Sequence, residues 1–297
     1  MTSVNGCEFR LSLVVATLGG DAELELLLAS LEQCKPPPNF EVIIVDQNDG
    51  DQLAATIARH AETLALRYEH VAFRGACRAR NHGARLARGQ WLGFPDDDCQ
   101  FSPDGLARIA SITGDPRIGV VTGRTVDEEG RPNVLQWGPT QRRFSRWSMF
   151  GCLTETTLFV DRDLFAAAGG FDEDFGPGGR WPAAEGIDLM DRLFAVLGDR
   201  EARYDPAIEL RHPTKIPPWN RWAARRFYEY AQGDGALIAK RFSLHMLYWG
   251  CRTLLAGVRN ALTTEKWQSA AYLLRIAGLF KGFVTYSLRR RAPECAA

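Results

Sequence analysis

The sequence lacks a long apolar run, a CxxC pair and an excess of charge of either sign. No stretch reaches about 18 uncharged apolar residues, so no transmembrane helix is expected. The first ten residues are polar, without the apolar core of a signal peptide. Lys plus Arg and Asp plus Glu each number 36, a balance that argues against a general nucleic-acid binder. We therefore expect a protein of the cytoplasm.

Cysteine is scarce, and the seven residues are scattered without ligand-like or disulfide-like spacing. This pattern predicts reduced and mostly buried thiols rather than a zinc site or a disulfide framework. The rest of the composition is ordinary, with 45% hydrophobic and 24% charged residues, which excludes a disordered chain. A length of 297 residues suits one domain of about 200 residues with an appendage.

Apolar runs alternate with helical patterns in the first part of the chain. The runs at 11–16, 40–45 and 90–94 predict buried strands, and the patterns between them predict helices. This order predicts a mostly parallel sheet with helices on both faces, a Rossmann-like α/β fold. The character changes near residue 215, after which the sequence is helical, aromatic and basic. We therefore predict an α/β domain over residues 1–215 and a helical region over 216–297.

Polar residues end these strands: Thr17 follows the first, Asp46 and Asp49 the second, and the triplet 96–98 the third. Ligands collect at the carboxyl ends of parallel strands. Three adjacent carboxylates repel one another unless a cation offsets their charge, and hard oxygen donors favour Mg²⁺ or Mn²⁺ over zinc. A solvated acidic turn is the alternative interpretation.

Four segments carry a family resemblance: SLVVATLGG, VIIVDQNDGD, ARNHGARLARGQWLGFPDDD, and GGFDEDFGPGG followed by AEGIDLMDRLFAVLG. They occur in order between residue 12 and about residue 213. With these segments the sequence resembles a family-2 glycosyltransferase, an inverting enzyme of the GT-A fold from bacterial glycan biosynthesis. The resemblance implies a GT-A fold and a nucleotide-sugar donor.

Residue by residue, the resemblance implies a donor site at the strand ends. Thr17 matches a position that contacts the nucleotide, and Asp46 matches the acidic residue that reads the base, with Asp49 assisting. Arg80 matches the arginine that lies against the base and phosphates. An aspartate at the base favours a UDP-sugar, and GDP- and dTDP-sugars stay open.

The same resemblance implies a divalent metal, Mn²⁺ or Mg²⁺. The family's D-x-D element falls on the triplet, where Asp96 addresses the ribose or sugar and Asp97 belongs to the donor side. Asp98 would ligate the metal. His212 matches a position that completes the metal or diphosphate shell.

An acceptor hydroxyl needs a general base, because a neutral alcohol is a poor nucleophile at neutral pH. The family supplies one from an E-D-x-D-like element, which here reads E-G-I-D over residues 185–188. Gly186 replaces the second acidic residue, so the base is Glu185 or Asp188, and Glu185 is preferred as the first acidic position. Asp188 with Arg192 also fits an ordinary helical ion pair. Asp172 and Trp181, in a glycine-rich loop, are candidates for the acceptor side.

The C-terminal helices combine apolar residues with basic ones. Arg252, Arg259 and Lys266 recur every seven residues, and the chain ends near Arg289–Arg291. Such helices favour peripheral attachment to the anionic inner face of the cell membrane, close to a lipid-linked acceptor. The alternative is a bundle that packs on the catalytic domain or on another subunit.

The sequence thus predicts an inverting, metal-dependent glycosyltransferase that moves a sugar from a nucleoside-diphosphate sugar to a glycan or lipid-linked acceptor. One alternative is a nucleotidyltransferase, although the turn after the first strand, ATLGGDAE, lacks the basic loop expected for a triphosphate. A second alternative is a non-catalytic, membrane-associated nucleotide-sugar-binding protein, which Gly186 keeps open.

Overall fold

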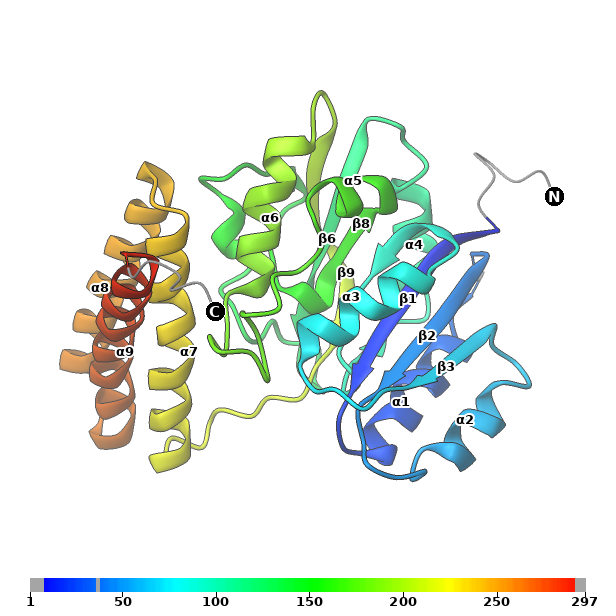
Figure 1. Cartoon of the computed structure of the whole chain (residues 1–297), viewed down its shortest axis with the longest axis horizontal. Coiled ribbons are helices and arrows are strands. Elements are labelled where there is room, and N and C mark those ends of the chain that lie inside the picture. Colours follow the sequence, from blue (N-terminus) through cyan, green and yellow to red (C-terminus); the bar gives the residue numbers. More distant parts are fainter. Residues whose placement is uncertain (1–7, 36–37, 292–297) are drawn as a thin grey trace, which may run out of the picture. The chain divides into compact units, whose positions relative to one another are not determined.

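The computed structural model describes residues 8–35 and 38–291, and Figure 1 shows the course of the chain. The chain forms two compact units. The first runs up to Asp172 and includes Leu189–Thr214; the second combines Glu173–Asp188 with the residues from Lys215 onward. Residues 173–188 thus group with the C-terminal helices.

A nine-stranded sheet forms the core of the first unit, in the order β3-β2-β1-β4-β8-β6-β9-β5, with β7 paired to β9. The strands are β1 (Phe9–Thr17), β2 (Phe40–Asp46), β3 (Leu66–His70), β4 (Gly89–Gly93), β5 (Gln100–Phe101), β6 (Ile118–Val126), β7 (Arg142–Arg143), β8 (Leu158–Asp161) and β9 (Glu201–Arg211).

The sheet is mixed in direction. Strands β1 to β4 are parallel, as predicted, whereas β8 runs antiparallel to both β4 and β6. Among the described residues between β6 and β8, no α-helix carries the chain back to the other end of the sheet. The chain therefore enters β8 beside the carboxyl end of β6, and the two strands run antiparallel.

Helices cover both faces of the sheet, because successive side chains of β1 point to opposite faces and both sets are buried. Leu13 lies in one apolar cluster with Leu28 and Ile109. Val14 points the other way, where a Cβ on Gly83 would overlap its side chain. The helices are α1 (Asp21–Glu32), α2 (Ala54–His60), α3 (Ala76–Leu86), α4 (Gly105–Ile112), α5 (Arg162–Ala167) and α6 (Glu185–Val196), the last of which begins in the second unit.

Three long helices dominate the second unit: α7 (Arg221–Lys240), α8 (Leu244–Thr263) and α9 (Lys266–Arg291) (Figure 1). Glycine lets α7 and α9 pack backbone against backbone, because a Cβ on Gly235, Gly278 or Gly282 would collide with the main chain of the other helix. Within the described residues, no helix combines the length and hydrophobicity needed to cross a bilayer.

One carboxylate in this bundle gives its stability a pH dependence. Asp234 in α7 lies 3.8 Å from Arg275 of α9, and burial raises the pKa of Asp234 to about 6 despite this neighbour. The folded pKa exceeds the unfolded one, so the native state binds the proton more tightly. The stability linked to this proton is present below about pH 4 and is lost as pH rises through about 6.

We therefore expect the free energy of unfolding of the parent protein to fall by on the order of 3 kcal/mol between pH 4 and pH 7 because of Asp234. The Asp234→Asn variant should not show this fall. Urea denaturation of both proteins across this range measures the difference. Asp199→Asn, at an exposed aspartate, is the control and should keep the slope of the parent protein. Identical slopes for the parent and Asp234→Asn would contradict the prediction.

Candidate functional site

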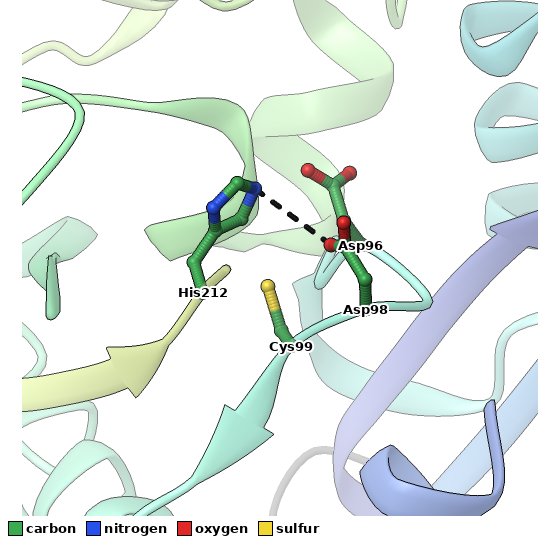
Figure 2. A group of neighbouring side chains, drawn as sticks. All are labelled: Asp96, Asp98, Cys99 and His212. Carbon is green, nitrogen blue, oxygen red and sulfur yellow. Dashed lines mark ion pairs between the residues drawn. The ribbon is translucent and has the colours of Figure 1, made fainter. Parts of the chain in front are cut away.

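Four potential metal-ligating side chains meet at the end of the sheet (Figure 2). Asp96 and Asp98 lie in the loop after β4, Cys99 precedes β5, and His212 follows β9. The antiparallel pairing of β5 with β9 joins Gln100 to Arg211, which brings the preceding cysteine and the following histidine together. One ligand atom from each of the four lies within 4.8 Å of the others.

The imidazole of His212 is oriented by its surroundings. Its Nδ1 lies 2.9 Å from the carbonyl oxygen of Pro213, and its Nε2 lies 3.7 Å from Oδ1 of Asp98. A carbonyl accepts only an N–H, so Nδ1 carries the proton and a neutral ring offers the Nε2 lone pair to a metal. The backbone is fixed as well, since His212 N donates to Val126 O and Asn133 Nδ2 donates to His212 O, at 2.9 and 2.8 Å.

Cys99 is a member of this cluster that the sequence analysis did not include. Its Sγ lies 3.1 Å from Oγ1 of Thr156, which also accepts a hydrogen bond from the backbone N of Asp96. Burial, together with the nearby carboxylates of Asp96 and Asp98, raises the pKa of the Cys99 thiol. The available signal was its position directly after the aspartate triplet. Cys34, Cys77 and Cys152 are also buried, as predicted, whereas Cys251 is exposed.

The other two aspartate contacts come from predicted donor-site residues. Arg80, on α3, is buried and places Nη2 2.5 Å from Oδ1 of Asp96. Thr17, at the end of β1, donates from Oγ1 to Oδ2 of Asp97 at 2.7 Å. Together with the pair of Asp98 and His212, these contacts bring six predicted residues to one edge of the sheet.

The loop after β2 carries Asp46 and Asp49, the two residues predicted to contact the base. Asp46 is fully buried, and its carboxylate accepts from the backbone N of Asn48 at 2.8 Å and from the Tyr68 hydroxyl at 2.7 Å. Asp49 is highly exposed. Gln47 was passed over in the sequence, and its Oε1 is buried with no hydrogen-bond partner among the described residues. This loop therefore offers Gln47 and Asp49, besides Asp46, as groups that could contact a base.

Both candidate bases belong to the second unit, at the start of α6. Asp188 is fully buried, and its Oδ1 lies 2.7 Å from Nζ of Lys240 and 2.9 Å from Nε of Arg241. Glu185 is also buried and is the first residue of the helix. Ala184, just before it, has a φ of 73°, a left-handed conformation that stores strain in a residue other than glycine.

The predicted acceptor-side residues lie in the preceding segment. Asp172 is partly buried. Trp181 is only 5% exposed and packs against Tyr286 of α9, with ring centroids 6.0 Å apart. In this arrangement the indole contributes to the packing of the second unit and offers a sugar little of its face.

The fold is an α/β type in which ligands bind at the carboxyl ends of the strands, and polar groups gather at those ends here. The sequence profile of glycosyl transferase family 2 matches residues 12–168, which is more than half of the chain. The chain belongs to this family.

Named relatives agree with this assignment. The chain is 31% identical over 223 residues to the validoxylamine A glucosyltransferase of Streptomyces hygroscopicus, covering 62% of this chain and 48% of that protein. It is 35% identical over 102 residues to an uncharacterized glycosyltransferase of Haemophilus influenzae, covering 34% of each. The chain spans less than half the length of each of these relatives.

Solved structures share the fold. A mannosyltransferase of Pyrobaculum calidifontis, in complex with GDP-Man and Mn²⁺, superposes with a TM-score of 0.64 at 19% identity, covering 96% of this chain and 88% of that one. Residues 1–349 of TarS from S. aureus, in complex with UDP-GlcNAc, superpose with a TM-score of 0.59 at 14% identity, covering 94% and 92%. The predicted GT-A fold is confirmed.

Proposed function

We propose that this protein transfers a sugar from a nucleoside-diphosphate sugar to a hydroxyl group of an acceptor, with inversion at the anomeric carbon. The observation that supports this reaction is the cluster of Asp96, Asp98, Cys99 and His212 beside Arg80, at the carboxyl ends of the strands. A diphosphate leaving group needs its developing negative charge neutralised, and this edge holds the groups to do it.

The donor set fits a divalent cation. The Asp98 carboxylate and an imidazole nitrogen of His212 suit Mn²⁺ or Mg²⁺, and the Cys99 thiol adds a softer neighbour. Asp98 and His212 would hold the ion, which when bound would supply charge neutralisation for the diphosphate. Arg80 fixes the Asp96 carboxylate, which then faces the ribose or the sugar. The fold is shared with a mannosyltransferase that binds GDP-Man and Mn²⁺.

Glu185 is the proposed base that takes the proton from the acceptor hydroxyl. Glu185 holds the first acidic position of the E-G-I-D element, whereas a proton gained at Asp188 Oδ1 would cost that residue two ion pairs. Asp188 then acts as a positioning residue that fixes the first turn of α6.

The finer assignments rest on the sequence. Thr17, Asp46, Asp49 and Asp97 line the donor site, with a UDP-sugar favoured, and Asp172 and Trp181 belong to the acceptor side. The acceptor is a glycan or a lipid-linked sugar, and the protein works at the inner face of the cell membrane. The support for this location is the basic and apolar character of the helices that follow residue 240.

Nucleotide binding tests the donor site directly. Calorimetry with UDP, GDP, dTDP and CDP, each with and without Mn²⁺ or Mg²⁺, should show metal-dependent binding of one diphosphate. Asp98→Ala should lower this affinity by more than about 100-fold, since even partners that only orient metal ligands contribute about 10–100-fold. Asp104→Ala, an exposed aspartate nearby, is the control. Nucleoside diphosphate binding with an affinity that depends neither on metal nor on Asp98 would overturn the proposed mechanism.

A further inference from the structure

Helix α8 turns one face away from the rest of its unit. Its buried residues are Met246, Gly250 and Gly257. A Cβ on Gly250 would lie 3.0 Å from Ile238 of α7, and one on Gly257 would lie 3.1 Å from Ile276 of α9. The helix therefore rests on its neighbours through its glycine side, and the opposite side is not covered by its own unit.

The uncovered side is apolar. Leu244, Leu255 and Leu262 are 76%, 70% and 81% exposed. In a regular helix their spacing places them within about 20° of one another, opposite the buried glycines. We call this face the α8 stripe; it consists of Leu244, Leu247, Tyr248, Cys251, Leu255, Val258 and Leu262, all exposed. A contiguous apolar surface of this kind marks an interaction site.

The charged residues beside the α8 stripe are all basic. Arg252 and Arg259 are exposed and lie along one border of the stripe, roughly 40–80° from its leucines. The sequence of α8 contains no aspartate or glutamate. Between residues 241 and 291, nine lysines and arginines stand against a single acidic residue, Glu265. This border is therefore complementary to an anionic surface.

Two kinds of occupant would cover apolar side chains here: a bilayer and a second copy of the chain. A second copy laid against the α8 stripe would bring another cationic border, and α8 has no carboxylate to pair with it. A membrane with anionic lipid satisfies both features, because its acyl boundary accepts the leucines and its headgroups accept the guanidinium groups.

We infer that the α8 stripe is the membrane-docking surface of this protein and that α8 lies in the plane of an anionic bilayer, with its leucines below the headgroups. The inference rests on the proposed membrane location and makes it specific to one helix face. It assigns binding to an exposed surface, so substitutions there leave the packing against α7 and α9 intact.

Vesicle sedimentation of the full chain tests this surface. Vesicles of phosphatidylcholine with equal phosphatidylglycerol should bind the protein, and vesicles of phosphatidylcholine alone should bind it weakly. Leu255→Gln with Leu262→Gln should lower partitioning about tenfold or more. Arg252→Gln with Arg259→Gln should lower binding to the anionic vesicles about fivefold for each arginine. Leu26→Gln, at a leucine that is 53% exposed on α1, is the matched control.

Cys251 offers a direct probe of insertion. It is exposed on the α8 stripe, and the other cysteines of the described residues are buried. An environment-sensitive fluorophore attached to Cys251, with Cys7 and Cys295 replaced by serine, should shift to shorter wavelength when anionic vesicles are added. An unchanged spectrum in the presence of bound vesicles would place the contact elsewhere and overturn the inference.

The outcomes separate three cases. Equal vesicle binding by the parent and by the leucine double variant would refute the role of α8 while leaving the membrane location in place. No binding by the parent protein would refute both. A parent protein that sediments as a dimer, with a monomeric leucine double variant and no vesicle binding, would assign the stripe to a second copy. Metal-dependent nucleotide binding, measured on the same variants, reports separately on the proposed reaction and should be unchanged.

Discussion

Glu185→Gln should lower the rate of sugar transfer by about 10²–10⁴-fold, the usual contribution of a positioned general base. Glutamine keeps the size of the side chain and its capacity to accept a hydrogen bond but cannot take a proton. Donor affinity should stay at the value of the parent protein, because Asp98, His212 and Arg80 are untouched. The measurement is transfer from the donor identified by calorimetry, followed as release of the nucleoside diphosphate.

Glu62→Gln is the matched control, since Glu62 is exposed in the loop between α2 and β3. It should transfer at the parent rate. If the protein binds nucleotide sugars without catalysis, the parent protein would show no metal-dependent turnover, and Glu185→Gln would not differ from it. Full activity in Glu185→Gln would transfer the role of base to another carboxylate.

Much of the polar cluster at the strand ends could be predicted because local patterns determine it. Thr17, Asp96 and Asp98 follow apolar strands, and side chains that follow parallel strands meet at one edge of a sheet. Cys99 was missed for a different reason. Its place beside His212 depends on the antiparallel register of β5 with β9, a pairing between residues more than a hundred positions apart. No local spacing reveals such a register.

The same distinction holds for the fold. Alternating strands and helices predicted the parallel half of the sheet, whereas the reversed direction of β8 follows from the long connection after β6. The grouping of residues 173–188 with the C-terminal helices also depends on distant contacts. Gly233 of α7 packs so tightly on Ala183 that an added Cβ would lie 2.6 Å from its carbonyl oxygen. A glycine in a helical pattern indicates close approach, but it does not name the partner.

The ion pairs of Asp188 lead to the second large effect. Asp188→Ala should lower the free energy of unfolding by about 3–5 kcal/mol, because it leaves Lys240 and Arg241 without their buried counter-charge. Urea denaturation of parent and variant measures this loss. Asp191→Ala is the control on the same helix: Asp191 pairs at 2.9 Å with Arg146, which is 36% exposed. Its removal should cost about 1 kcal/mol or less.

Asp188→Asn separates the positioning role from the catalytic one. If Asp188 fixes the start of α6, the asparagine variant should lose stability while keeping measurable turnover, and its pH–rate profile should keep the parent shape because the base is unchanged. In the Lys240→Met background the penalty of Asp188→Ala should shrink, since only Arg241 is then left without its partner. Loss of turnover in Asp188→Asn with unchanged unfolding would instead make Asp188 the base. A proton taken up by Asp188 would cost its ion pairs with Lys240 and Arg241, which is the physical reason for favouring Glu185.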